Sequence, residues 1–446
     1  MTSLSTKPAL PLPPGRFGLP IIGESILYLR DPQSFIAKRQ HLYGNIFKTH
    51  LFGRPTVALI GAEAVRFLFA NESQHFEMTN TLSFEVLLGD KSIGVQTGNA
   101  HQMLRRQLFQ AFQPRALANY AVTMEEITQR YLKKWEQRET LTWYDELKKY
   151  TLDIACRLFV GVSTAADENL KQVYETWSDG LLSLPIRVPG SKFDRAVRAR
   201  ERLLAQIDAI IDQRQQQISG KEDVLSILLQ AKDEAGNSLS RVDIKDNVLA
   251  MLVAGHETLT SALTSLCLLL AQHPKVLETL RTEQAQLGLS TPLTQEILKQ
   301  MTYLDQVLKE VLRILPPVVR SGSRKVLQSC ELSGYCIPQG WDVFYQIQET
   351  HQDQSIYTQP EQFDPERFSP ERSEDKQKVF SNIPFGGGMR ECLGKEFARL
   401  EMKIFTALLV REYEWEILGG QNLERVVLPF SRPQDGLKAR FWRRLR

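Results

Sequence analysis

Apolar residues recur at three- and four-residue spacing through most of the chain between Gly98 and Gln272. This spacing gathers them on one face of an α-helix. It predicts helices over residues 101–112, 115–138, 144–160, 167–182, 192–218 and 242–272. At 1.5 Å per residue the last helix would be about 45 Å long, which is enough to cross a globular protein.

The second half of the chain alternates shorter helices with turn-rich segments. Helices are predicted over 274–287, 294–301, 304–315 and 392–410, with Pro274 and the pair Pro316-Pro317 as boundaries. Short strands are predicted over 45–51 and 55–60, around a turn at Phe52-Gly53-Arg54-Pro55, then within 324–337 and near the C-terminus. The pattern therefore indicates a mainly α protein with small β-sheets, of the α+β class.

Composition narrows the class of protein. The chain has 446 residues, 42% of them hydrophobic and 24% charged, so it can bury a large core without disulfides. Its formal charge is 55 − 52 = +3, and the basic residues are scattered, so we expect no nucleic-acid partner. An odd number of cysteines, five, favours a reducing compartment.

The sequence predicts no transmembrane anchor and a cytoplasmic location. The Pro-rich lead-in over residues 1–15 contains no apolar signal-peptide core. The longest apolar stretch, 248–271, carries His256 and Glu257 at its centre, where an ionised carboxylate would be costly inside a bilayer. We interpret that stretch as a buried helix of a globular protein.

The segment 385–394 combines three consecutive glycines with a cysteine. Glycines allow the backbone positive φ angles and close approach to a flat ligand. Cys392 is expected to open a helix, whose N-terminal amides favour an anion, and Arg390 adds positive charge. These residues favour a reactive thiolate, although an inert buried cysteine after a glycine turn explains the same local pattern equally well.

This segment resembles the haem-binding loop of the cytochrome P-450 family, at the positions Phe385, Gly388, Arg390, Cys392 and Gly394. The resemblance implies that Cys392 is the axial thiolate ligand of the iron in haem b (iron protoporphyrin IX). It also implies that Phe385, Gly388 and Arg390 contribute to cofactor binding. The implied fold is one cytochrome P-450 domain over residues 1–446, with a long central helix over the haem.

Glu310 and Arg313 are three residues apart on a predicted helix and point away from its apolar face. Pattern alone predicts an exposed ion pair. The family resemblance implies instead a buried network of these two residues with Arg367, in the segment Pro365-Glu366-Arg367-Phe368.

The long helix contains Ala254-Gly255-His256-Glu257-Thr258, which on pattern alone is a polar break in a core helix. Gly255 indicates either close packing or room for a ligand. The segment is similar to the family motif in which Thr258 would hydrogen-bond dioxygen or ordered water and Glu257 would relay protons. His256 occupies the variable position and is expected to be structural.

His101 and Arg105 are four residues apart on a predicted helix, where an exposed pair is the simplest interpretation. By resemblance they contact the haem propionates, together with Arg390 and Arg324. Arg320 competes with Arg324 for this role.

Several further segments resemble the retinoic acid hydroxylase branch of the family, among them Thr350-His351 and 383–397. The resemblance implies a monooxygenase that inserts one oxygen atom of O2 into a C–H bond of an apolar substrate such as retinoic acid or a related apocarotenoid. The expected electron donor is a ferredoxin-like protein or a flavoprotein. An acidic ferredoxin-like donor would dock on basic residues near the cysteine, namely Arg106, Arg115, Lys395 and Arg399.

Two alternatives remain at this point. A haem-thiolate isomerase or peroxygenase needs no reductase, but such enzymes usually lack the acid-Thr pair seen at Glu257 and Thr258. A non-enzymatic haem sensor usually carries an output domain, for which the chain leaves no room.

Overall fold

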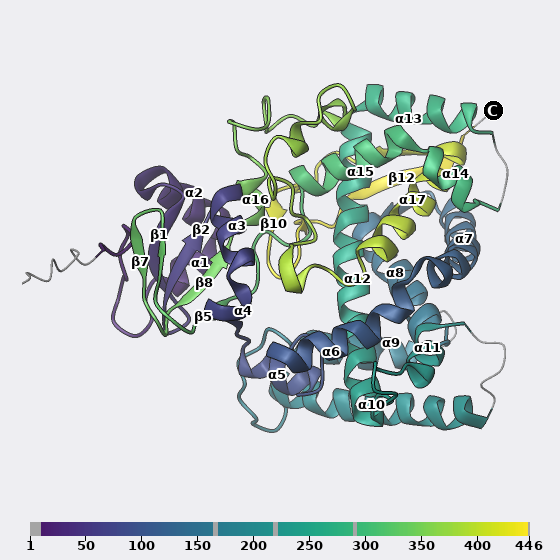
Figure 1. Cartoon of the computed structure of the whole chain (residues 1–446). Helices are drawn as coiled ribbons and strands as arrows, with labels where there is room; N and C mark the ends of the chain where they lie inside the picture. Colours follow the sequence, from purple (N-terminus) through teal and green to yellow (C-terminus); the bar gives the residue numbers. More distant parts are fainter. Residues whose placement is uncertain (1–9, 164–167, 217–221, 289–291, 445–446) are drawn as a thin grey trace, which may run out of the picture. The chain divides into compact units, whose positions relative to one another are not determined.

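The computed structural model describes residues 10–163, 168–216, 222–288 and 292–444. Figure 1 shows mainly helices with small sheets, as the hydrophobic pattern predicts. The chain forms two compact units that are interleaved in sequence. Unit 1 comprises Met1–Thr79, Val319–Pro360 and Asp375–Glu391, and unit 2 comprises Asn80–Val318, Glu361–Glu374 and Cys392–Arg446. The single domain over residues 1–446 stays a prediction.

Unit 1 is built on a five-stranded sheet in the order β1-β2-β8-β5-β3. The predicted hairpin is confirmed, because β1 and β2 pair antiparallel around Phe52 and Gly53, whose φ angles are 53° and 80°. Two successive positive φ angles match the twist of a two-residue hairpin. The strands are β1 (Ile46–Leu51), β2 (Arg54–Leu59), β3 (Phe76–Met78), β5 (Arg324–Val326) and β8 (Asp342–Tyr345).

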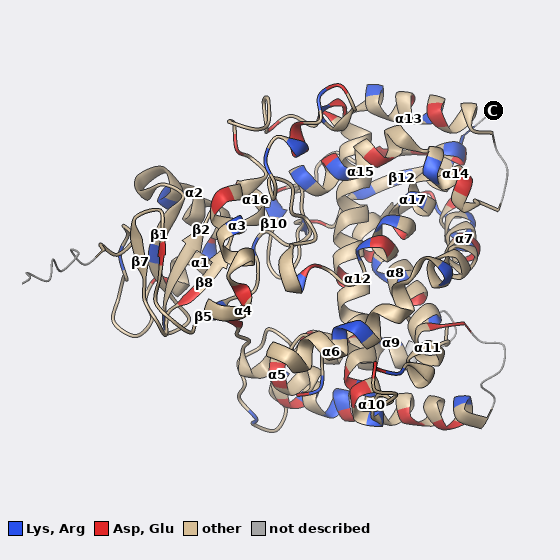
Figure 2. Cartoon of the chain, viewed as in Figure 1, with Lys and Arg blue, Asp and Glu red and all other residues tan. Residues whose placement is uncertain are grey.

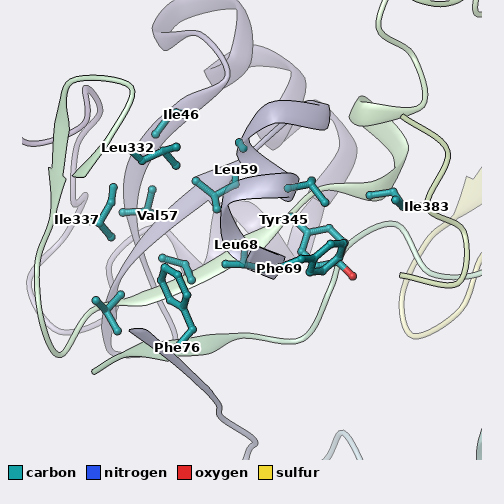
Figure 3. Packing of buried hydrophobic residues seen from close by; sticks show 14 of the residues in the cluster. Ile46, Val57, Leu59, Leu68, Phe69, Phe76, Leu332, Ile337, Tyr345 and Ile383 are labelled. Atoms are coloured by element: carbon teal, nitrogen blue, oxygen red, sulfur yellow. The ribbon is translucent and has the colours of Figure 1, made fainter. Parts of the chain in front are cut away.

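The core of unit 1 lies where this sheet meets α3 (Ala62–Ala70). Val57 and Val343 come from the sheet, Leu68 and Phe69 come from α3, and all four are buried in one cluster. Figure 3 shows Val57, Leu68 and Phe69 of this cluster. Ile383, from the segment that leads to the cysteine, joins the same cluster. This core therefore anchors the start of the glycine-rich loop.

The remaining elements of unit 1 are short. The predicted strands within 324–337 correspond to β5 and to the hairpin of β6 and β7. The others are α1 (Ser25–Arg30), α2 (Pro32–Tyr43), α4 (Glu72–His75), β6 (Cys330–Leu332), β7 (Tyr335–Ile337), α16 (Ile347–Thr350) and η5 (Gly388–Arg390).

Unit 2 is the helical part, and the long predicted helices are confirmed to within a few residues. The predicted limits 167 and 218 lie outside the described residues. The helices are α5 (Leu82–Leu88), α6 (Gly98–Phe109), α7 (Pro114–Glu136), α8 (Trp143–Phe159), α9 (Glu168–Ser178), α10 (Lys192–Gln216), α11 (Val224–Gln230), α12 (Arg241–Gln272), α13 (Pro274–Gln286), α14 (Gln295–Gln300), α15 (Thr302–Ile314) and α17 (Lys395–Glu412).

The predicted C-terminal strands are also present. In unit 2 they form a three-stranded sheet, β4-β12-β9, and a two-stranded one, β10-β11. The strands are β4 (Thr140–Thr142), β9 (Tyr413–Ile417), β10 (Arg425–Val426), β11 (Arg432–Pro433) and β12 (Lys438–Arg443).

Local sequence fixes both ends of α12. Ser240 and Asp243 form a capping box, in which each side chain accepts from the other's backbone N–H. Pro274 begins the next helix, α13, at the position where a missing N–H costs nothing. By length and composition α12 could cross a membrane, but 78% of its most apolar window is buried inside the protein, as in the core helix of a globular protein. Figure 2 shows that charged residues are rare along it.

Candidate haem-thiolate site

The loop 385–390 adopts a conformation that requires glycine. Gly386 and Gly388 have φ angles of +68° and +66°, in the left-handed region that other residues rarely adopt. A Cβ on Gly387 would lie 2.6 Å from Cε2 of Phe69, so the loop also packs too closely on α3 for a side chain. Residues 386–388 of the loop therefore consist of backbone without side chains.

The loop is tied to the rest of unit 1 by a buried histidine. The backbone N–H of Ile383 donates to Nε2 of His351 at 2.8 Å, and His351 is fully buried after α16. An acceptor at Nε2 places the ring proton of the neutral imidazole on Nδ1. The sequence predicts no role for His351 beyond the resemblance at Thr350-His351, because a lone histidine carries no signal of the amide that its ring will accept from.

Cys392 follows the loop but does not open a helix. Glu391 has extended backbone, with ψ of 144°, and α17 begins at Lys395 with Gly394 as its N-cap. The predicted helix start at Cys392 is therefore wrong, because the chain leaves helical conformation at Glu391 and regains it only after Gly394. Of the five cysteines, all of which the structure describes, Cys392 is the one with an exposed side chain.

Arg324 is held within unit 1 by a carboxylate that lies beside the loop. Its Nε donates to Oε1 of Glu72 at 2.7 Å, both residues are buried, and the guanidinium lies 5.5 Å from the ring centre of Tyr345. The other carboxylate oxygen of Glu72 would be 3.0 Å from a Cβ on Gly388. Glu72, the partner of Arg324, therefore lies next to the exposed glycine of the loop.

Arg320 points elsewhere in unit 1. Its guanidinium carbon lies 4.7 Å from the ring centre of Phe344 and 5.6 Å from that of Tyr28. The two arginines that sequence could not distinguish therefore have different surroundings.

The middle of α12 carries a short uncovered face. In the stretch 246–270, all of which the structure describes, every residue is buried except Val253, Ala254, Gly255 and Thr258. Ala254 is exposed, and Thr258 lies one turn later with its hydroxyl donating to the carbonyl of Ala254 at 2.7 Å. The lone pairs of the Thr258 hydroxyl remain as acceptors on this face.

Gly255 serves close packing. A Cβ at this position would lie 2.9 Å from the ring of Phe159 on α8. Of the two explanations that the sequence left open, the structure favours helix packing over room for a ligand.

Glu257 is buried between charged and polar neighbours of unit 2. Its Oε1 lies 3.8 Å from Nζ of Lys148 on α8 and 3.7 Å from Nε2 of His256. Burial raises the pKa of the Glu257 carboxyl, and Lys148 partly opposes this rise. A carboxyl whose pKa is raised holds its proton to higher pH and can serve as a proton donor.

His256 has the contacts of a structural residue. It is fully buried, its Nδ1 lies 2.7 Å from the hydroxyl of Thr151, and its ring packs edge-on against Tyr174. Burial holds the pKa of His256 well below its usual range, so the ring is neutral.

His101 and Arg105 lie one turn apart on α6. His101 is buried and Arg105 is partly exposed, so the pair is not the fully exposed one that simple pattern predicts.

The Glu310 network is present and buried in unit 2. Both carboxylate oxygens of Glu310 bind Arg313, at 2.7 and 2.8 Å, and Oε1 also accepts from Nε of Arg367 at 2.9 Å. All three side chains are fully buried. The exposed ion pair predicted from pattern alone is wrong, and the network implied by the family resemblance is confirmed.

The residues present fit a haem-thiolate centre. A planar macrocycle needs a surface free of side chains, which the partly exposed Gly386 and the exposed Gly388 provide, and iron needs a soft ligand, which the exposed Cys392 provides. The described residues hold no group of three His, Cys, Asp or Glu side chains arranged to bind a metal ion by themselves.

Comparison with known proteins gives a consistent result. The family model for cytochrome P-450 matches residues 13–441. The chain is 48% identical to a putative cytochrome P-450 120 of Synechocystis sp. over 99% of both chains, and 36% identical to cytochrome P-450 26B1 of Rattus norvegicus over 97% of this chain and 87% of the relative. A solved structure described as retinoic acid bound cyanobacterial CYP120A1 superposes with a TM-score of 0.93 at 48% identity, covering 98% of this chain and all of that one. The chain therefore belongs to the cytochrome P-450 family and is a haem b monooxygenase.

Proposed function

We propose that this enzyme hydroxylates retinoic acid or a closely related apolar apocarotenoid, with Cys392 as the axial ligand of its haem. The observation that carries the ligand assignment is the exposed thiol of Cys392, directly after a loop of bare glycine backbone. The substrate proposal rests on the 48% identity to a protein solved with retinoic acid bound.

Charged residues would hold the haem carboxylates. Arg390 in the loop, Arg324 on β5 and the pair His101 and Arg105 on α6 supply the donors. Arg324 is preferred over Arg320 because Arg324 binds Glu72, which lies beside Gly388, whereas Arg320 packs on Tyr28 and Phe344. Phe385, half-buried in the same loop, would support the cofactor through packing.

Bound haem supplies the redox chemistry by which one atom of O2 enters a C–H bond and the other becomes water, using two electrons and two protons. The protein moves the protons. Glu257 would take a proton on its carboxylate and release it toward Thr258, whose hydroxyl oxygen accepts hydrogen bonds because its own proton is held by Ala254 O.

The electrons would come from a ferredoxin-like protein or a flavoprotein, and we propose a cytoplasmic location for the reaction. The basic residues suggested for docking, Arg106, Arg115, Lys395 and Arg399, belong to α6, α7 and α17 of unit 2. Arg106 forms an exposed ion pair with Glu234 at 2.9 Å.

The test compares Cys392→Ser with Cys336→Ser, which alters a half-exposed cysteine on β7. In the dithionite-reduced carbon monoxide complex, we expect the parent and Cys336→Ser to show the strongly red-shifted Soret band of a thiolate ligand, and Cys392→Ser to lose it. A red-shifted band that survives Cys392→Ser would refute the ligand assignment.

The substrate is tested separately on the parent protein. We expect retinoic acid to cause a saturable change in the ferric Soret band and to yield a product that is heavier by one oxygen atom in mass spectrometry. Binding that does not saturate below the solubility of retinoic acid would refute the substrate and leave the ligand assignment intact.

A further inference from the structure

One carboxylate oxygen of Glu257 is shared between two neighbours in unit 2. Oε1 lies 3.8 Å from Nζ of Lys148 and 3.7 Å from Nε2 of His256. Glu257 is 7% exposed and His256 is fully buried, whereas 27% of the Lys148 side chain is exposed. The acid therefore sits between a group that reaches solvent and one that does not.

The hydrogen bonds around the histidine favour a proton on Nδ1. The hydroxyl of Thr151 donates to the carbonyl of Leu147 at 3.0 Å and also lies 2.8 Å from the hydroxyl of Thr260, which donates to the carbonyl of His256 at 3.0 Å. With its proton directed to one of these oxygens, the Thr151 hydroxyl can accept from Nδ1 of His256 at 2.7 Å. Nε2 has no partner within hydrogen-bond range, and proteins tolerate an unpaired buried N–H less often than an unpaired buried lone pair.

The two neighbours consequently favour opposite protonation states of Glu257. The ammonium of Lys148 can only donate, so it stabilises the ionised carboxylate. Nε2 of His256 can only accept, so it stabilises the protonated carboxyl. A small movement of Oε1 toward either side would form one full hydrogen bond.

We propose that His256 is a positioning residue for proton delivery, whose Nε2 accepts the carboxyl proton of Glu257, while Lys148 holds the same side chain once it is ionised. Glu257 thus changes partner each time it gains a proton from solvent and gives it up to the reaction. The proposal rests on the proton-delivery role of Glu257 proposed above and assigns a function to the variable position of the motif.

The other titratable groups around Glu257 fit this arrangement. Asp179 and Glu175, at the end of α9, raise the pKa of Glu257 and so favour its protonated form. Burial, then the charge of Glu257, raises the pKa of Tyr144 to about 12, so the phenol stays neutral at working pH. Tyr174 is fully buried with its pKa raised well above the usual value, chiefly by burial, and is neutral as well.

Two substitutions should shift the pH profile in opposite directions. The measured quantity is hydroxylated product per electron consumed, which falls as pH rises through the pKa of Glu257 because the acid must be protonated to give a proton. His256→Leu removes the acceptor of the protonated form, so the profile should move to lower pH. Lys148→Met removes the partner of the ionised form, so the profile should move to higher pH. At a fixed pH above the pKa of Glu257, where product yield is falling, loss or gain of one net hydrogen bond corresponds to about a fivefold change in that yield.

Further variants separate positioning from folding. Gln at position 256 retains an acceptor, so the pH profile of His256→Gln should lie between those of His256→Leu and the parent. In Glu257→Gln the fall in product yield with rising pH should be absent. Thr264→Val is the matched control, because it removes a buried hydroxyl two turns along α12 that binds only the carbonyl of Thr260 in this structure. Its profile should equal that of the parent.

The tautomer is testable without turnover. In the diamagnetic ferrous carbon monoxide form of the holoprotein, labelled with 15N-histidine, the signals of His256 are those lost in His256→Gln. We expect a protonated Nδ1 and a bare Nε2 whose chemical shift moves as Glu257 takes up its proton, and Glu257→Gln should abolish this movement. A protonated Nε2 at neutral pH would overturn the proposal.

The outcomes distinguish this proposal from the one on which it rests. A parent protein without a thiolate spectrum or without retinoic acid turnover would defeat the proposed function. A parent that performs both, with variants at His256 and Lys148 that load haem normally yet shift the profile in the same direction or not at all, would defeat the role of His256 alone.

Discussion

At the scale of single residues, two Glu-Arg pairs with the same spacing have different environments. Glu63 and Arg66 lie three apart on α3, 2.8 Å from each other, and about two thirds of each side chain is exposed. Glu310 and Arg313 have the same spacing and a closest distance of 2.7 Å, and neither is exposed at all. Spacing therefore predicts that two side chains meet, and the surrounding fold decides whether water surrounds them.

Replacing Glu310 should be far more damaging than replacing Glu63. Glu310→Ala leaves the guanidiniums of Arg313 and Arg367 buried without the carboxylate that binds both, at a cost of about 3–5 kcal/mol. Glu63→Ala breaks an exposed pair and should cost at most about 1 kcal/mol. The yield of haem-loaded protein and the urea midpoint report the difference, and equal midpoints for the two variants would contradict the buried network.

At the scale of elements, hydrophobic periodicity predicted all the long helices but missed some of the shorter ones. The predicted helices 115–138 and 144–160 match α7 and α8 closely, because each presents a continuous apolar face over several turns. Helix α2 was missed, although Asp31 caps it and Pro32 occupies its first turn. Those two residues were the available signal, since the apolar face of α2 is weak.

The glycine-rich loop offers an element-scale prediction with a close control. Gly388 and Gly334 are both exposed with positive φ, at +66° and +82°, but only a Cβ on Gly388 would meet other atoms, at 3.0 Å from Glu72 and 3.2 Å from Phe69. Both Gly→Ala variants incur the left-handed backbone cost of about 1–2 kcal/mol.

Gly388→Ala should additionally displace the loop and reduce haem content, whereas Gly334→Ala should retain full haem content with a slightly lower melting temperature. Haem per protein, from absorbance, is the measurement. Full haem loading of Gly388→Ala with an unchanged carbon monoxide spectrum would show that the loop tolerates a side chain there.

At the scale of the whole molecule, the distribution of charge bears on the proposed docking of an acidic electron donor. The net charge of +3 is small, and Figure 2 shows both signs spread over the helices. A local basic surface, rather than the net charge, would therefore have to attract an acidic donor. Lys395 and Arg399 lie one turn apart on α17, three and seven residues after Cys392.

The double variant Lys395→Glu with Arg399→Glu should slow reduction by an acidic ferredoxin about tenfold at low ionic strength, and the deficit should shrink as salt is added. Arg195→Glu with Arg198→Glu, at two exposed positions on α10, changes the net charge equally and serves as the control. The measurement is the rate of haem reduction by the ferredoxin in stopped-flow experiments on both double variants. Equal slowing in both variants would indicate a general effect of net charge and would refute the proposed docking surface on α17.

Hydrophobic periodicity is a local property of the chain, so the helical character could be predicted from the sequence. The family, the candidate ligand Cys392 and the candidate acid Glu257 followed from the resemblance of short motifs to the cytochrome P-450 family. The folded structure was needed to confirm that Glu310 is buried and to show that Gly255 packs on Phe159, that Arg324 rather than Arg320 binds Glu72 beside Gly388, and that Glu257 lies between Lys148 and His256. Each of these features involves residues that are distant in sequence. Their burial and hydrogen bonding therefore depend on how the chain folds. A linear pattern carries no record of those contacts until the chain has folded.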